Sequence, residues 1–194
     1  MYIPTMYRVE ETSRIFSFVR NNAFGQLISN VAGRSHVTHM PFLLSADNKN
    51  IVGHLAVANP QHAELEGSEV LITFQGPHDY ISPTWYRSAA VPTWNYQAVH
   101  IYGECRVFKD PEKLKLAIDE LAAENEQDFE EPWIPDYKPS KLRGIVGVRI
   151  KITDVQCQFK LDQGKAADEI NNIADQVEAR GEYKLAAAMR AEIK

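Results

Sequence analysis

An aromatic-rich stretch, residues 74–103, holds the side chains best suited to contact a flat ligand. It contains two of the three Trp of the chain, together with several Tyr and Pro. Trp and Tyr combine a broad apolar face with a polar edge, so they line binding sites as well as cores. Pro fixes the backbone beside them and Gly permits sharp turns, which holds the rings in defined positions. The composition therefore predicts a site for a planar ligand or a tight protein interface.

Other common chemistries are poorly represented in the sequence. It contains no P-loop, no dinucleotide-binding glycine fingerprint and no G-x-S-x-G elbow. His36 and His39 are three residues apart in a strand-like run, so they point to opposite faces, and we expect no metal site. Cys105 and Cys157 both lie in strand-like runs and are expected to be buried free thiols in a reducing cytoplasm.

The charge pattern limits the kind of partner. A net charge of −5 argues against a surface that attracts nucleic acid everywhere. The C-terminal residues 165–194 are long enough for a helix-turn-helix, but their acidic and basic side chains balance, which favours a packing or dimerising hairpin. Residues 138–165 are basic, and they either pair with the acidic residues 110–136 or bind a phosphate or an acidic partner.

The elements that position these side chains are mostly short strands. Apolar alternation predicts strands over residues 25–31, 36–44, 51–57, 69–75, 98–108 and 144–161, the second of them interrupted by Pro41. Helices are expected over residues 7–22, after the Asp110-Pro111 cap and from Lys165 onward. The pattern is typical of a β-barrel or sandwich with peripheral helices. We expect no secretory signal and no membrane span, since no apolar run is long enough.

Six motifs together resemble the PaiB family, the FMN-binding negative transcriptional regulators of bacteria. They are T-H-M-P-F at 38–42, G-H-L-A-V-A-N-P-Q at 53–61, F-Q-G-P-H-D-Y-I-S-P-T-W-Y at 74–86, V-P-T-W-N-Y-Q-A-V-H at 91–100, I-V-G at 145–147 and K-L-D-Q at 160–163. Their order and spacing cover nearly the whole chain up to Gln163.

The resemblance implies a fold and an assembly. The fold is a mainly β, six-stranded Greek-key FMN-binding split barrel, similar to the pyridoxamine-phosphate oxidases, with peripheral helices and a C-terminal helical hairpin. We expect residues 1–163 to form the barrel domain and residues 164–194 a helical appendage. A cytoplasmic homodimer with two FMN sites at the subunit interface is also implied.

The resemblance further implies which residues hold FMN. They are the side chains and backbone of Thr38, His39, Met40, Pro41, His54, Leu55, Ala56, Asn59, Gln61 and Gln75, with Thr93, Trp94, Asn95 and Tyr96 from the partner subunit, and Lys160 and Gln163 closing the site. Trp94 is the best stacking candidate, and Arg87 is a further candidate for the phosphate. Two features depart from the family pattern: residues 87–90 are a short stretch where the family usually has a longer, Lys-containing one, and Asp162 and Gly164 stand where the family has Ser and Asn. A carboxylate at 162 would repel a phosphate nearby.

Two functions of different classes follow. The first is an FMN-binding negative regulator of transcription, with DNA as a partner that the charge pattern does not support. The alternative is an FMN-dependent oxidoreductase acting on a small molecule, in which the flavin carries the redox chemistry. A third reading is a barrel that has lost its cofactor and only mediates association. No residue stands out as a general acid or base.

Overall fold

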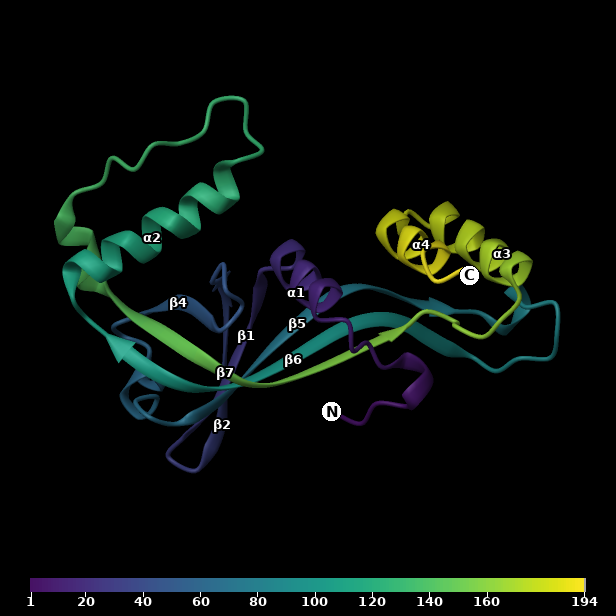
Figure 1. Cartoon of the computed structure of the whole chain (residues 1–194), viewed down its shortest axis with the longest axis horizontal. Helices are drawn as coiled ribbons and strands as arrows, with labels where there is room; N and C mark the ends of the chain where they lie inside the picture. The colour runs from purple at the N-terminus through teal and green to yellow at the C-terminus, as the bar shows by residue number, and fades with distance from the viewer. Residues whose placement is uncertain (194) are drawn as a thin grey trace. The chain divides into compact units, whose positions relative to one another are not determined.

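The computed structural model describes residues 1–193 and has a mainly β architecture, which confirms the predicted fold class (Figure 1). Seven strands form a sheet in the order β2-β1-β5-β6-β7-β4-β3. The strands are β1 (Phe24–Val31), β2 (Arg34–Pro41), β3 (Leu43–Leu44), β4 (Asn50–Ala56), β5 (Glu69–Ile81), β6 (Thr93–Phe108) and β7 (Ile145–Lys160). The helices are α1 (Thr12–Asn21), α2 (Pro111–Glu126), α3 (Ala167–Ala179) and α4 (Tyr183–Arg190), with 3-10 turns η1 (Thr5–Tyr7), η2 (Pro60–Glu64), η3 (Pro83–Trp85) and η4 (Pro139–Gly144). None of these helices is long and apolar enough to cross a membrane.

The described residues divide into two compact units. The helical unit consists of Met1–Phe18, Gln75–Val99 and Gln156–Lys194, and the barrel unit of Val19–Phe74 and His100–Val155. Strands β5, β6 and β7 each give one part of their length to each unit. The predicted domain boundary after Gln163 remains a prediction.

A very short link joins the two end strands of the sheet within the barrel unit. β2 and β3 stand at opposite ends of the strand order, and Phe42 alone separates them in the chain. The predicted interruption at Pro41 is confirmed, and it accounts for seven strands where six were expected. Inside, the Phe42 ring packs edge-on against Phe74 of β5 with centroids 5.6 Å apart, and Gly53 of β4 leaves room for Met40.

Two strands are longer than the sequence predicted. β5 continues to Ile81 and β6 begins at Thr93, so much of the expected aromatic loop is strand. Gly76 and Pro77 look like a turn in the sequence, but Gly76 serves another purpose. A Cβ at Gly76 would lie 2.6 Å from the Phe18 ring, so the glycine permits close packing within an extended strand.

The first helix is shorter than predicted because its N-terminal part pairs with a strand. α1 starts at Thr12, whereas the prediction began at residue 7. Arg8 forms an isolated antiparallel bridge with Gln158, and the Val9 N–H donates to the Cys157 carbonyl at 3.2 Å. This pairing holds the segment extended.

The remaining helices begin close to where the sequence indicates, α2 at Pro111 and α3 at Ala167. The Asp110 carboxylate caps α2 by accepting from the Lys113 N–H at 2.9 Å, with Pro111 at the first helical position. α3 and α4 form the predicted C-terminal hairpin and lie side by side in Figure 1. Gly181, at φ +93°, occupies the left-handed turn between them.

Candidate functional site

Three of the predicted flavin contacts form a hydrogen-bonded cluster in the barrel unit. The Thr38 hydroxyl donates to Gln61 Oε1 at 2.6 Å and accepts from Asn59 Nδ2 at 2.8 Å. The Asn59 side chain also accepts from the Gln61 N–H at 3.0 Å, so it caps η2. Gln61 is fully buried, and its Nε2 donates to the Leu27 carbonyl and the Ser29 hydroxyl. The cluster therefore fixes the turn after β4 against β2.

Strand alternation separates the other predicted contacts of the barrel unit into two sets. Met40 and Leu55 are buried in the barrel core, whereas His39 and Ala56 are exposed. His54 lies between these extremes, and burial lowers the pKa of its imidazole. A ligand on the outside of the barrel would meet the side chains of His39, His54 and Ala56, and would reach Met40 and Leu55 only through their backbone.

The two segments that carry these residues are in direct contact. A Cβ at Gly53 of β4 would lie 2.4 Å from Met40 Cε and 3.3 Å from the Pro41 carbonyl oxygen. The structure thus brings together the predicted T-H-M-P and G-H-L-A segments. Pro41 lies next to Gly53, the residue before His54.

In the helical unit, alternation along β6 divides the predicted aromatic contacts. Asn95 is buried on one face, whereas Trp94 is 55% exposed on the other and Tyr96 is partly exposed. The Trp94 ring meets the edge of Tyr80 at a centroid distance of 6.1 Å, which supports one end of the indole and leaves much of it free. Trp94 is therefore placed to offer a flat face, and Asn95 is not.

Lys160 organises a polar hollow of the helical unit. Its ammonium group donates to the Thr93 hydroxyl and, at 2.7 Å, to the Trp94 carbonyl. It lies 5.9 Å above the Tyr7 ring, and burial lowers its pKa while Asp162 partly restores it. The hollow, of about 450 Å³, is also lined by Tyr86 and Lys165. Because an ammonium group has three donors and two are engaged, one remains for a ligand.

A buried polar network lies behind this hollow. Asp162, 8% exposed, accepts from the Tyr86 hydroxyl at 3.0 Å and from Asn95 Nδ2 at 2.7 Å. Burial and the nearby Asp162 carboxylate both raise the pKa of Tyr86 and of Tyr7, so both phenols stay protonated at neutral pH. Asn95 Oδ1 is buried with no hydrogen-bond partner among the described residues. The carboxylate at position 162 is thus held by two donors.

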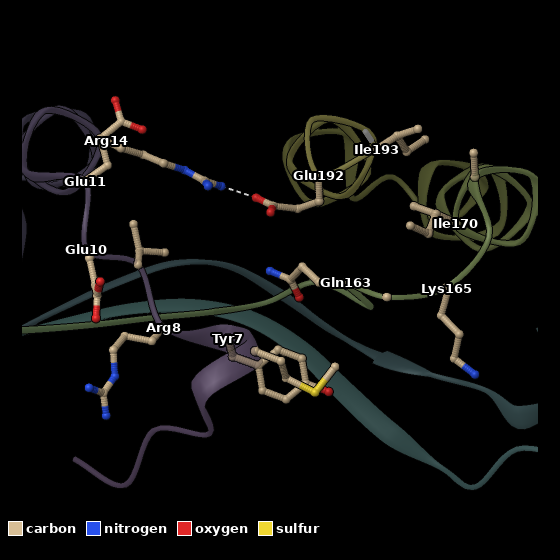
Figure 2. A pocket seen from close by; sticks show the side chains of 14 residues that line it. Tyr7, Arg8, Glu10, Glu11, Arg14, Gln163, Lys165, Ile170, Glu192 and Ile193 are labelled. Atoms are coloured by element: carbon tan, nitrogen blue, oxygen red, sulfur yellow. Dashed lines mark hydrogen bonds and ion pairs between the residues drawn. The ribbon is translucent and has the colours of Figure 1, made fainter.

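A second pocket of the helical unit, about 530 Å³, is lined by the N-terminal segment, the start of α3, and Glu192 and Ile193 (Figure 2). Arg14 reaches across it and forms an ion pair with Glu192, which is 12% exposed. Side chains of both charges line it, among them the basic Arg8 and Lys165 and the acidic Glu10. It has no dominant charge that would select one kind of ligand.

The last two predicted contacts differ in their availability. Gln163 is engaged with its own backbone, donating to the Phe159 carbonyl at 2.7 Å and accepting from the Leu161 N–H at 2.8 Å. Gln75 is exposed, and its Nε2 lies 3.3 Å from His78 Nδ1. Arg87 pairs with Asp168 of α3, so its charge is already partly offset.

Within residues 1–193 no three His, Cys, Asp or Glu side chains gather as a metal site would require.

Sequence reasoning missed the tyrosines and the buried network. Tyr7, Tyr86 and Lys165 come from three distant segments, and no spacing in the sequence links them. One signal was available for the network. In an alternating strand, Asn95 and Gln97 point to the same face as the apolar Val99. This predicts that both polar side chains are buried.

Comparison with known proteins defines the class of this chain. Residues 1–154 match the family described as "Putative FMN-binding domain", and the chain belongs to this family. It is 40% identical over 185 residues to "Protease synthase and sporulation protein PAI 2" of Bacillus subtilis (strain 168), covering 92% of this chain and 89% of the relative. The predicted membership of the PaiB family is confirmed.

Solved structures agree on the fold. The FAD and heme binding protein from Mycobacterium smegmatis aligns with a TM-score of 0.66 at 13% identity, covering 84% of this chain and 78% of that one. The flavocytochrome Anf3 from Azotobacter vinelandii aligns with a TM-score of 0.65 at 13% identity, covering 79% and 69%. These likenesses confirm the split-barrel fold and extend no further.

Proposed function

We propose that this chain is a flavoprotein that binds FMN, as the family to which it belongs indicates. The observation that carries the proposal is the hollow around Lys160, whose donors suit a phosphate group. Lys160 and Lys165 supply two positive charges, and the Tyr7 and Tyr86 phenols and the Thr93 hydroxyl supply neutral donors. Asp162 opposes them with one negative charge, so the two lysines still outweigh it. When bound, FMN would supply redox chemistry.

The flavin ring needs a flat wall and polar groups at its edge. We infer that Trp94 and Tyr96 provide the wall, because their rings lie on the accessible face of β6. In the barrel unit, the exposed His39 and the half-buried His54 are the proposed contacts at the ring edge. Thr38, Asn59 and Gln61 act by positioning this surface, since their polar groups bond to one another.

We further propose that the protein works as a cytoplasmic homodimer in which FMN binds between subunits. Exposed apolar side chains on the helical unit support this: Val91 is 75% and Trp94 is 55% exposed beside the Lys160 hollow. Size-exclusion chromatography with light scattering measures the subunit number. A monomer that still binds FMN tightly would contradict the shared site.

We propose that the protein is a PaiB-like negative regulator of transcription, and that its C-terminal hairpin does not read DNA. Arg190, which would be a phosphate contact on α4, instead forms ion pairs with Asp175 and Glu178 of α3, both at 2.6 Å. We therefore propose that negative regulation acts through flavin state or another protein. A DNA affinity that falls steeply with salt would contradict this. Oxidation of NADPH by the flavin-loaded protein would favour the oxidoreductase alternative.

Comparing FMN with riboflavin tests the phosphate site, because the two differ only in the phosphate. We expect Lys160→Gln to weaken FMN binding roughly tenfold or more, since a charge-assisted hydrogen bond is lost. Riboflavin affinity should stay nearly unchanged. Lys184→Gln, an exposed lysine on α4, is the matched control. The quenching of flavin fluorescence on titration measures both affinities for the wild type and for each variant.

Either of two results would overturn the assignment. If Lys160→Gln lowers the affinity for both flavins equally, Lys160 supports the fold and does not bind phosphate. If the wild-type protein neither carries flavin absorption bands nor quenches flavin at micromolar concentration, the cofactor proposal itself fails.

A further inference from the structure

A pocket of about 590 Å³ in the barrel unit carries a different chemical signature from the residues proposed to hold FMN. It lies between the start of α2, the turn η4 and the adjoining ends of β4 and β7. Val57, Leu114, Leu142 and Ile145 line it with apolar groups, and Lys109 and Arg143 supply its charges.

The pocket is positive and its cations are unpaired. No acidic side chain lines it, and neither Lys109 nor Arg143 forms an ion pair within the described part of the chain. Two other cations of the same unit have acidic partners: Arg106 pairs with Glu66 and Glu104, and Lys115 pairs with Asp119. Lys109 and Arg143 are thus left free beside an apolar cavity.

The walls of the cavity are set firmly. Leu114 is 3% and Leu142 is 7% exposed, so both are anchored in the barrel unit. The Val57 N–H donates to the Gly144 carbonyl at 2.9 Å, which ties the end of β4 to the residue next to Arg143. A cavity with fixed apolar walls and a few polar groups at its edge is the usual form of a small-molecule site.

We propose that this pocket binds a small carboxylate with an aromatic or aliphatic body. The body is removed from water against the leucine, valine and isoleucine side chains, which favours binding in proportion to the apolar area covered. The carboxylate accepts hydrogen bonds from the Arg143 guanidinium, whose fork matches its two oxygens, and lies within the field of Lys109. The site goes beyond the proposed function and uses none of the residues assigned to flavin.

Isothermal titration of the full chain with 3-phenylpropionate and 3-phenylpropionamide tests the proposal. The two compounds share one body and differ in charge. We expect the acid to bind at least tenfold more tightly than the amide, because a hydrogen bond to a charged group is lost in the amide. Arg143→Gln should weaken the acid roughly tenfold and leave the amide unchanged. Arg149→Gln, an exposed arginine of β7 outside this pocket, is the matched control and should behave as wild type.

Three outcomes would overturn the proposal. They are equal affinity for acid and amide, an acid affinity that Arg143→Gln does not change, and no heat from either compound in the millimolar range. Circular dichroism checks that Arg143→Gln folds. If it does not fold, Lys109→Gln takes its place, and we expect a similar loss of affinity for the acid. Each titration is repeated with FMN present. Displacement of the acid by FMN would assign the pocket to the flavin, whereas acid binding without any flavin binding would leave this site standing and refute only the cofactor proposal.

Discussion

Replacing Tyr86 by Phe removes a single hydroxyl from the buried network and should destabilise the protein measurably. The Tyr86 hydroxyl donates to Asp162 Oδ1 at 3.0 Å, and Asn95 donates to Oδ2 at 2.7 Å, with no further donor to this carboxylate among residues 1–193. Because Asp162 is 8% exposed, water replaces the missing donor poorly. A hydrogen bond to a charged group contributes about 1.5–3 kcal/mol, so we expect the free energy of unfolding to fall by about 2 kcal/mol.

Urea unfolding of the flavin-free protein at neutral pH measures this loss, with Tyr183→Phe as the matched control. Tyr183 is 66% exposed, so removing its hydroxyl should change stability by less than about 0.5 kcal/mol. Asp162→Asn removes the charge that makes the bond strong, and asparagine tolerates the left-handed backbone at φ +63°. In the double variant the two changes should fall short of additivity by about 1–2 kcal/mol.

A loss of stability for Tyr86→Phe no greater than that for Tyr183→Phe would show that the Tyr86 hydroxyl does not stabilise the network. The same conclusion follows if the two substitutions in the double variant are strictly additive. Either result would mean that the hydroxyl and the carboxylate do not depend on each other, and that Asp162 is held by Asn95 alone.

Three further predictions concern charge, packing and pH. Asp162→Asn should raise FMN affinity several-fold, up to roughly tenfold, because it removes a negative charge from the proposed phosphate site. Riboflavin affinity should stay unchanged, and fluorescence titration measures both affinities. Gly103→Ala should destabilise by about 2 kcal/mol or more in thermal unfolding, because its Cβ would lie 2.5 Å from a backbone carbonyl of β7. Burial raises the pKa of both Cys105 and Cys157 to about 12, from about 9 for an exposed thiol, so both should resist a thiol reagent in the native protein. Since the unfolded thiols ionise first, stability should be unaffected by them below about pH 9 and fall as pH rises from about 9 to 12 in urea titrations.

The sequence predicted those parts of the fold that depend on local signals. Asp110 and Pro111 specify a helix start by themselves, and Pro41 interrupts a strand wherever that strand lies. The failures arise where distant contacts decide. Gly76 has the local appearance of a turn, but the nearby Phe18 ring, which is distant in sequence, accounts for a glycine within the strand. Likewise, residues 8 and 9 fit a helical pattern, but pairing with β7 holds them extended.

The candidate site was predictable in its segments and not in its geometry. The motif containing Thr38 and the motif containing Gln61 do meet, yet their polar groups satisfy each other, which no spacing could indicate. Strand alternation was available to show that Trp94 and Asn95 face opposite ways. The donors around Lys160 converge from segments more than sixty residues apart, such as Thr93, and tertiary structure alone brings them together.

The one-residue link at Phe42 has a consequence for self-association. A sheet that returns on itself leaves few unpaired strand edges, and free edges are the usual starting point for aggregation. Here β3 has only two residues. The contact between β2 and β4 near Gly53 therefore depends on the short tether at Phe42. Lengthening that tether with flexible residues would loosen this contact and expose the β2 edge along its full length. Chain connectivity therefore limits how far the β2 edge can separate from β4 in the barrel unit.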